Sequence, residues 1–539
     1  MFNSVTLENV TVLGELGHRL LRNCMRLESD IYQPDKVYQP IEYDWPADWE
    51  GRVLLALVRQ MEATHREPSY MREIFRGVYA RFNEKGYLGK ILPEGFFDEQ
   101  QISGHNWLLR ALLEYTRLTG DTEARAAALR IIENLYLPLK GAYHRYPIRP
   151  EYRVFEGNPD GSLTGDCIEG WYLSTDIGCA YMCLDALGMA CRDLKLPELP
   201  ELLEEMVGEF AAIDFWNLSM QTHATLSGIR GILWYYEAVH RPELLDTAVR
   251  LYTMYLDKGT TENYANHNWF NRPLWTEPCA IVDSYIVAME LFRLTEDVKW
   301  LETAQRIYYN ALCHAQRENG GFGCDNCVGS GTLFLTVQGD GRDASWCCTM
   351  RGGEGLAEVA KSVALEKDGV LYIALYDPAE IRLPDCTVEL RTTYPADGHV
   401  ELLLKGRPKA GKIALFLPSY ARDAVVNVDG TRQVMTPQQG FIPVDVAENS
   451  HVTLDFTIPV QKLACSGASA SEGCYKLSYG FTLLGVRGQQ ETHPDLNRLV
   501  SLGNGGYQAG AVQLYPVGDT YKIPMSELQE HSWQLVFRK

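Results

Sequence analysis

Two short stretches of the chain place metal-binding side chains at the start of predicted helices. The first, LWTEPCAIVDSY, carries Glu277, Pro278 and Cys279, and the second, DASWCC, carries the adjacent pair Cys347 and Cys348. Zinc accepts carboxylate oxygen and thiolate sulfur in one tetrahedral set. These residue types therefore predict a zinc site built from one carboxylate and three thiolates.

The adjacent cysteines set a condition on the backbone. Neighbouring side chains of an extended segment point to opposite sides, so we expect a sharp turn at residues 347–348, made possible by Gly352 and Gly353. A rival set joins the same pair to Cys324 and Cys327, because their C-x-x-C spacing is typical of structural zinc sites. Spacing alone does not separate the two sets.

The composition limits the classes of function. The chain has 539 residues, 46% of them hydrophobic and 22% charged, and a formal net charge of −20. This acidic balance argues against a nucleic-acid partner, which would need clustered Lys and Arg, and it fits a neutral sugar or another small molecule. The first residues, MFNSVTLENV, lack the pattern of a secretory signal, and no apolar run approaches the ~18 residues of a membrane span. We therefore expect a cytoplasmic protein without a membrane partner, whose 14 cysteines are thiols or metal ligands.

The elements that must position these residues are helical over the first two thirds of the chain. Four segments repeat an amphipathic helix, a polar turn and a second helix with a matched arginine, at Arg76, Arg130, Arg250 and Arg306. The arginines recur at roughly 55 positions or twice that, a period that indicates stacked helical hairpins. We predict about six hairpins closed into a mainly α, (α/α)6 toroid over residues 41–366, the last helix lying in GEGLAEVAKSVALEK.

The rest of the chain changes to a period of two. Short alternating runs such as HVELLLKG and HVTLDFTIPV, separated by Gly, Pro and Asp-Gly, predict an all-β, antiparallel sandwich over residues 367–539, possibly split into two small sandwiches. The run SVTLENVTVL within residues 1–40 is expected to add a strand to it.

An acidic and aromatic stretch, YDWPADWE, precedes the first hairpin. It contains Asp44, Asp48 and Glu50 beside Trp45 and Trp49. These side chains could line a sugar pocket, but an acidic surface at the start of a helix is the favoured interpretation.

Several segments resemble one known family in order along the chain. LWTEPCAIVDSY, then IYYNAL, then SWCC, with KGYLG, GHNWLLRALLEYTRLTGD and THATLSGIRGILWYYEA upstream, resemble the motifs of the β-L-arabinofuranosidase family of retaining glycoside hydrolases. The resemblance covers roughly residues 45 to 380, and EPC with CC is its specific part.

The resemblance implies a mechanism. A zinc ion would be held by Glu277, Cys279, Cys347 and Cys348, with Cys347 as the catalytic nucleophile. Glu262, fifteen positions before Glu277, would be the acid/base group. A metal-bound thiolate can attack an anomeric carbon, and a carboxyl group can protonate the leaving oxygen and then activate water.

The resemblance also implies a sugar pocket. His105 and His223 match histidines that line it, and Gln305 stands in the segment where the family has a glutamate that contacts sugar hydroxyls. Pro278 replaces the family's small residue between the two ligands. Both departures bear on which sugar is bound.

The expected reaction is hydrolysis of terminal non-reducing β-L-arabinofuranosides or a related sugar, with a small carbohydrate as the partner and a homodimer contact through the sandwiches. Two alternatives stay open. An unsaturated-uronyl hydrolase on a similar toroid would need a pair of acidic residues and no metal, and a non-catalytic carbohydrate-binding protein would use the zinc only for structure.

Overall fold

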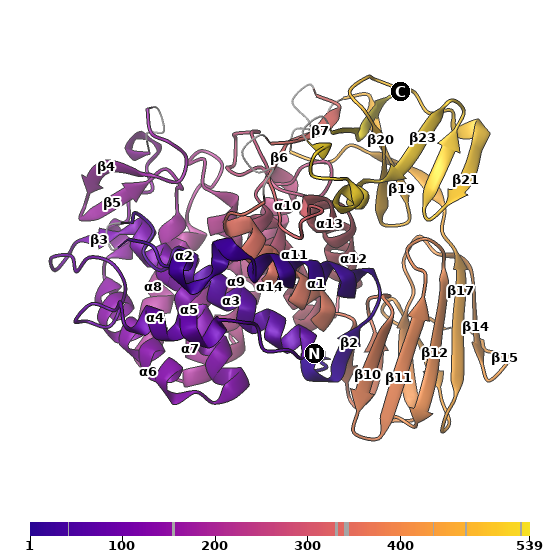
Figure 1. The fold of residues 1–539 in the computed structure, drawn as a ribbon, viewed down its shortest axis with the longest axis horizontal. Coiled ribbons are helices and arrows are strands. Elements are labelled where there is room, and N and C mark those ends of the chain that lie inside the picture. The colour runs from indigo at the N-terminus through magenta and orange to yellow at the C-terminus, as the bar shows by residue number, and fades with distance from the viewer. Residues whose placement is uncertain are drawn as a thin grey trace.

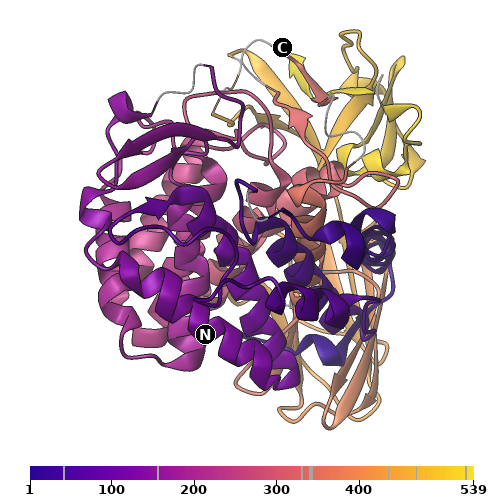
Figure 2. The ribbon, with the colours of Figure 1, turned by 60° about the vertical axis from the view of Figure 1, so that its left-hand side comes forward.

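A ring of helices lies beside two β units in the computed structural model (Figure 1). The structure describes residues 1–40, 43–153, 157–328, 332–338, 344–434, 436–468, 470, 472–528 and 531–539. Figure 2 shows both β units on the same flank of the helical part. None of the described helices is long and apolar enough to cross a membrane.

Six inner helices form a closed ring, in which each helix packs against the next and the sixth returns to the first. They are α3 (Asp48–Thr64), α5 (Glu99–Thr119), α7 (Cys183–Leu194), α9 (Thr222–Val239), α11 (Pro278–Thr295) and α14 (Cys347–Lys361). Most of their residues are buried on all sides, which is why these helices show little amphipathic pattern.

Amphipathic helices cover the ring from outside, each following the inner helix against which it packs. They are α4 (Met71–Tyr79), α6 (Thr122–Ile131), α8 (Leu199–Ala211), α10 (Pro242–Lys258) and α12 (Val298–Ile307). The four matched arginines all lie on these outer helices. The N-terminal α1 (Glu15–Leu27) packs against α14 and α3, where the chain supplies no following outer helix because it enters the β region after α14.

The first β unit consists of a five-stranded and a seven-stranded sheet, and the N-terminal segment contributes a strand to each. The first has the order β1 (Asn3–Ser4), β8 (Ala364–Lys367), β9 (Val370–Ile373), β13 (Lys412–Phe416) and β16 (Phe441–Asp445). The second has the order β15 (Thr431–Arg432), β14 (Arg422–Val428), β17 (His451–Thr457), β12 (His399–Gly406), β11 (Cys386–Thr392), β10 (Ala379–Leu383) and β2 (Val10–Val12). One pair, β9 with β13, is parallel, so the prediction of a purely antiparallel region is wrong at this point.

The second β unit takes strands from two distant parts of the chain. It contains β18 (Val460–Ala464), β19 (Cys474–Tyr479), β20 (Thr482–Arg487), β21 (Leu499–Gly503), β22 (Gly506–Ala509), β23 (Val512–Pro516), β24 (Ser532–Gln534) and β25 (Val536–Arg538). The loop before α14 adds β6 (Asp325–Asn326) and β7 (Phe334–Val337), the latter paired with β24. A small sheet of β3 (Phe97–Asp98), β4 (Leu163–Ile168) and β5 (Trp171–Ser174) lies on the helical part.

The segment around α14 differs from its prediction. The helix begins at Cys347 and ends at Lys361, and residues 364–367 form strand β8 rather than a continuation of the helix. Cys347 and Cys348 are the first two helical residues, so no glycine turn is needed to bring them together. Gly352 instead faces Phe322, whose ring a Cβ atom would overlap, and Gly353 faces Asn23 and Gln60. These glycines permit close packing within the ring.

We predict that Gly352→Ala destabilises the protein, because the added methyl group meets a buried aromatic ring in a packed core. Overpacking of this kind costs roughly 1–3 kcal/mol. The control is Gly208→Ala on the exposed face of α8, where nothing lies within 4 Å of the new Cβ. Alanine there should raise the free energy of unfolding by up to about 1 kcal/mol. Urea midpoints that fall equally for both variants would contradict this account.

Candidate active site

Three thiols meet where the N-terminal ends of α11 and α14 come together. The Cys279 Sγ lies 3.7 Å from the Cys347 Sγ and 3.9 Å from the Cys348 Sγ, and the last two are 3.9 Å apart. Sulfur ligands at about 2.3 Å from a tetrahedral zinc are separated by about 3.8 Å. The spacing of the three sulfur atoms therefore fits one zinc ion.

A carboxylate lies beside this group and forms a second metal-compatible group with Cys279 and His223. Glu277 is the residue before α11, and its Oε1 lies 3.4 Å from the His223 Nδ1. Its Oε2 is buried and has no hydrogen-bond partner, as expected of an oxygen available to a cation. Pro278 occupies the first helical position, where proline is favoured, so this departure from the family does not disturb the turn. Cys279 thus belongs to two metal-compatible groups, one with Cys347 and Cys348 and one with Glu277 and His223.

The four cysteines of the rival thiolate set do not all lie together. The Cys324 Sγ is 3.9 Å from the Cys348 Sγ, but Cys324 is absent from the metal-compatible groups of the described residues. The Cys327 thiol is directed to the Asn266 carbonyl oxygen at 3.9 Å. Cys324 therefore borders the cluster, and Cys327 lies outside it.

Of the three clustered thiols, Cys347 is the one poised as a thiolate. Hydrogen bonds from Cys279 and Cys348, with the positive charges of Arg52 and His223, hold the pKa of Cys347 well below its ordinary value. It is also the first residue of α14, where the helix dipole favours an anion. Cys347 is partly exposed, whereas Cys279 and Cys348 are buried.

Arg52 places a positive charge beside the clustered thiols. Its Nη1 lies 3.6 Å from the Cys279 Sγ, and its Nε donates to the Asp48 Oδ1 at 2.8 Å. The guanidinium group stacks on the Trp107 ring at 4.1 Å. A fixed, buried cation beside the thiols lowers the cost of their ionisation.

A cavity of about 410 Å³ opens above the cluster, and Cys347, Cys348 and Glu277 form part of its wall. Six aromatic residues line it: Tyr43, Trp45, Trp49, Trp275, Phe322 and Trp346. Four aspartates join them: Asp44, Asp48, Asp160 and Asp176. The favoured interpretation of YDWPADWE as a surface is therefore wrong for Trp45, Trp49 and Asp48, whereas Asp44 is exposed and Glu50 accepts from the Gln39 amide. Flat aromatic faces among carboxylates suit a sugar ring.

Asp176 differs from the other carboxyl groups of the cavity. Burial, together with the negative charge of Glu277, raises its pKa to about 8, although His223 opposes the shift. It therefore carries a proton at neutral pH. It follows β5 in an irregular loop, so no helical or strand pattern in the sequence indicated it.

Glu262 does not face the cysteines, which corrects its prediction as the acid/base group. Its carboxylate pairs with Lys476 at 2.8 Å, both side chains being 1% exposed, and accepts from the backbone amides of Ser466 and Gly467. It is not among the residues that line the cavity. Its contacts join the helical part to the second β unit.

Two of the three predicted sugar contacts also lie elsewhere. The His105 Nε2 accepts from the Leu88 amide at 3.0 Å and its Nδ1 donates to the Gln101 carbonyl, while burial lowers its pKa to about 4. The Gln305 amide donates to the Ala374 carbonyl at 3.0 Å. Both are buried structural groups outside the cavity, and His223 is the predicted sugar contact that lines it.

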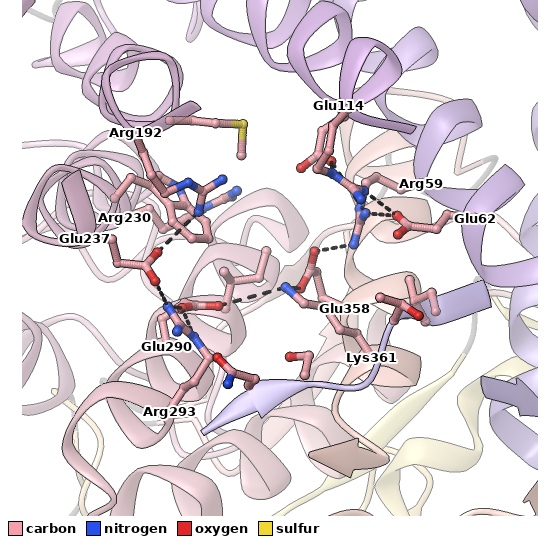
Figure 3. A pocket seen from close by; sticks show the side chains of 18 of the residues that line it. Arg59, Glu62, Glu114, Arg192, Arg230, Glu237, Glu290, Arg293, Glu358 and Lys361 are labelled. Atoms are coloured by element: carbon pink, nitrogen blue, oxygen red, sulfur yellow. Dashed lines mark hydrogen bonds and ion pairs between the residues drawn. The ribbon is translucent and has the colours of Figure 1, made fainter. Parts of the chain in front are cut away.

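A second cavity, of about 310 Å³, lies at the opposite end of the ring and is lined by charged side chains from the C-terminal halves of the inner helices (Figure 3). Arg59 pairs with Glu62 and Glu358, and Arg293 pairs with Glu237 and Glu290. Every inner helix contributes to this wall, so all six run in the same direction. Residues 3–7 form part of the same wall.

Comparisons with known proteins agree in part with the motifs. Residues 370–460, which span β9 to β17, match the family model of the middle domain of GH127 β-L-arabinofuranosidases. A GH127 β-arabinofuranosidase structure is 13% identical, with 100% of this chain and 98% of that chain covered and a TM-score of 0.71. A GH127 β-L-arabinofuranosidase from Geobacillus stearothermophilus T6 is 14% identical, with 98% and 100% covered and a TM-score of 0.67. No curated protein matches the sequence.

We predict that the charged cavity makes the fold sensitive to acid. Burial opposes ionisation of Glu358, but Lys361 and Arg59 lower its pKa to about 2. A lowered folded-state pKa contributes stability that is present above the unfolded value of about 4.5 and is lost as the pH falls toward 2, by up to about 3 kcal/mol. Glu358→Gln should reduce the urea midpoint at pH 7 and flatten its decline between pH 5 and 3.

The matched control is Glu448→Gln on an exposed turn, which should leave both the midpoint and its pH dependence unchanged. A Glu358→Gln variant with the pH profile of the wild type would show that Glu358 contributes nothing to acid stability.

Proposed function

We propose that the chain is a glycoside hydrolase that acts on terminal non-reducing β-L-arabinofuranosides or a closely related sugar. Its residues 370–460 match the middle domain of the β-L-arabinofuranosidase family, and its overall fold is similar to two structures of that family. The proposed reaction proceeds with retention, and Cys347 is the proposed nucleophile. One observation carries this proposal: a partly exposed thiol with a lowered pKa belongs to a zinc-compatible cluster at the wall of a cavity of sugar size.

In the proposed mechanism, Glu277, Cys279, Cys347 and Cys348 would hold a zinc ion, which would keep its sulfur ligands deprotonated. The donor set and the unpartnered Glu277 oxygen support this choice of metal. The residues of the chain then supply the nucleophile, the acid and the shape of the cavity.

The first half-reaction joins the sugar to Cys347. The thiolate attacks the anomeric carbon and forms a C–S bond while the bond to the leaving oxygen breaks. Asp176, protonated at neutral pH, gives its proton to that oxygen. We assign this role to Asp176 because it lines the same cavity as Cys347.

The second half-reaction releases the sugar. The Asp176 carboxylate, now ionised, takes a proton from a water molecule whose oxygen attacks the anomeric carbon, and the C–S bond breaks to return the Cys347 thiolate. Two displacements at one carbon give net retention. Asp176 regains its proton, so the cycle closes without any other reactant.

The fold that carries the site, and the cellular compartment of the protein, also belong to the proposal. We interpret the ring and its outer helices as a complete (α/α)6 toroid that carries the site at the N-terminal ends of its inner helices. A partly exposed, low-pKa thiol is readily oxidised, which supports a reducing, cytoplasmic compartment. The homodimer contact through the β units stays a prediction.

We predict that Cys347→Ser lowers kcat/KM for 4-nitrophenyl β-L-arabinofuranoside by at least about 1,000-fold, because a serine hydroxyl is far less ionised than this thiol. The variant should remain folded. The control is Cys327→Ser, which changes a buried thiol outside the cluster and should keep its turnover. Full turnover by Cys347→Ser would exclude the proposed nucleophile, and an absence of stoichiometric zinc from the wild type would favour a two-carboxylate hydrolase.

We predict that Asp176→Asn lowers kcat/KM by about 100- to 10,000-fold for substrates with a poor leaving group. It should have little effect on 2,4-dinitrophenyl glycosides, whose departure needs no proton. In the wild type, kcat/KM should fall as the pH rises through about 8, where Asp176 loses its proton, and this limb should vanish in the variant.

Glu262→Gln is the matched control for Asp176→Asn. It weakens the ion pair with Lys476 and should lower the melting temperature while keeping the alkaline limb of the pH profile. If Glu262→Gln removes that limb and Asp176→Asn retains it, the assignment of the acid is reversed.

A further inference from the structure

Two buried amide side chains in the cavity wall have atoms without a hydrogen-bond partner. Asn268 is 1% exposed and Gln221 is 2% exposed, and both line the cavity beside Cys347. Neither the Asn268 Nδ2 nor its Oδ1 has a partner, and the Gln221 Oε1 has none. Among the buried amides that the structure describes, Asn268 is the one in which both side-chain atoms are unpaired.

The backbone around these amides is, in contrast, fully engaged. The backbone N–H of Asn268 donates to the backbone carbonyl of Trp275 at 3.0 Å. The backbone carbonyl of Asn268 accepts from the backbone N–H of Thr222 at 2.9 Å. Gln221 forms an isolated bridge with Trp269 and donates its own amide to the Ile177 carbonyl at 3.0 Å. Asn268 and Gln221 are therefore held on adjacent extended segments at the start of α9, and their positions are fixed before any ligand arrives.

Buried amides normally find partners, because an unpaired buried donor or acceptor is destabilising. Gln316, which does not line the cavity, shows the usual situation: its Nε2 donates to the Arg19 carbonyl and its Oε1 accepts from the Arg19 guanidinium group. The unpaired atoms of Asn268 and Gln221 belong to two residues of the same cavity wall, so a ligand in that cavity is the natural partner.

We propose that Asn268 and Gln221 orient the substrate by hydrogen bonds to sugar hydroxyls away from the anomeric carbon. An asparagine amide offers a donor and an acceptor side by side, which matches two neighbouring hydroxyl groups of a sugar ring. Because an amide side chain neither gains nor loses a proton near neutral pH, Asn268 acts as a positioning and specificity residue and takes no part in acid/base catalysis. The proposal rests on the proposed function and names its substrate class.

The charges of the cavity restrict that class to neutral sugars. The wall contains the acidic side chains of Glu277, Asp44, Asp48 and Asp160, opposed by Arg52 and His223. A uronate would bring a further negative charge into a site already rich in them, where like charges repel. The side-chain amides of Asn268 and Gln221, which we propose as partners of the sugar hydroxyls, are neutral. They therefore add no positive charge that could offset this repulsion.

The test combines a protein change with a substrate change. Wild type and Asn268→Ala are assayed with 4-nitrophenyl β-L-arabinofuranoside and with its 2-deoxy, 3-deoxy and 5-deoxy forms. In the wild type, loss of the hydroxyl that Asn268 contacts should lower kcat/KM roughly 10- to 100-fold, as for a buried partner left unpaired. In Asn268→Ala the same deoxygenation should cost less than about 3-fold. Equal penalties in both proteins for every hydroxyl would overturn the proposal.

Controls separate positioning from damage to the fold. Gln305→Ala changes a buried amide outside the cavity and should keep the wild-type dependence on each hydroxyl. Asn268→Asp preserves the shape of the side chain and serves if the alanine variant does not fold. Gln221→Ala should reduce the dependence on a hydroxyl that is distinct from the one read by Asn268.

A binding assay separates this inference from the proposed function. If the wild type hydrolyses no arabinofuranoside, calorimetry with the neutral sugars L-arabinose, D-galactose and D-glucose, and with D-glucuronate and D-galacturonate, tests the amides directly. Binding of a neutral sugar that Asn268→Ala weakens at least about 10-fold supports the inference although the proposed activity fails. Failure of every neutral sugar to bind, or tighter binding of a uronate, overturns it.

Discussion

The parallel alignment of six inner helices is the constraint on which the rest of the structure depends. Each helix ends in partial charges, positive at its N-terminus and negative at its C-terminus, and the ring gathers like ends together. At the N-terminal end the chain places thiols and carboxylates, including Cys279 and Cys347. At the C-terminal end it places Arg59, Arg293 and Lys361 among acidic partners (Figure 3). The direction of the helices thereby decides which end of the ring can stabilise a thiolate.

A buried layer of ion pairs connects the two ends. Arg351 and Arg230 both pair with Asp283, whose Oδ2 lies 3.3 Å from the His223 Nε2. The opposite ring atom, His223 Nδ1, lies 3.4 Å from Glu277. Burial alone would lower the pKa of this histidine, but the two carboxylates raise it. The layer of ion pairs therefore holds the side chains of His223 and Glu277 in one orientation. Hydrophobic residues could fill the same space but would not orient these polar side chains.

The sequence predicted the parts of the site that depend on local pattern. The EPC and CC motifs each lie within one helical turn, so their residue types identified the three clustered thiols and Glu277 as one of two candidate sets, and the helical period identified the hairpins. Predictions that depend on distant contacts were less successful. Lys476 is 214 positions from Glu262, and nothing near Glu262 in the sequence signals that a buried lysine neutralises it. Asp176 lies in an irregular loop where no periodicity applies.

The wrong predictions for individual residues have a common physical cause, which is contact with distant segments of the chain. His105 matches a family motif, yet its ring nitrogens are both used by the backbone, which only the folded structure reveals. Gly352 follows two cysteines and was expected to form a turn, but the requirement it meets is the approach of Phe322 from another segment. Motifs therefore identified which side chains carry the chemistry, whereas packing determined which of their neighbours support it.

The most direct test of the central claim is intact-protein and peptide mass spectrometry of the wild type, quenched in acid during turnover of a slow 2-fluoro-β-L-arabinofuranoside. The account predicts one added glycosyl group on the peptide that contains Cys347, and no such adduct in Cys347→Ser. A glycosyl group found on an aspartate or glutamate of the cavity would contradict the claim, as would an enzyme that turns over with no covalent adduct at any time.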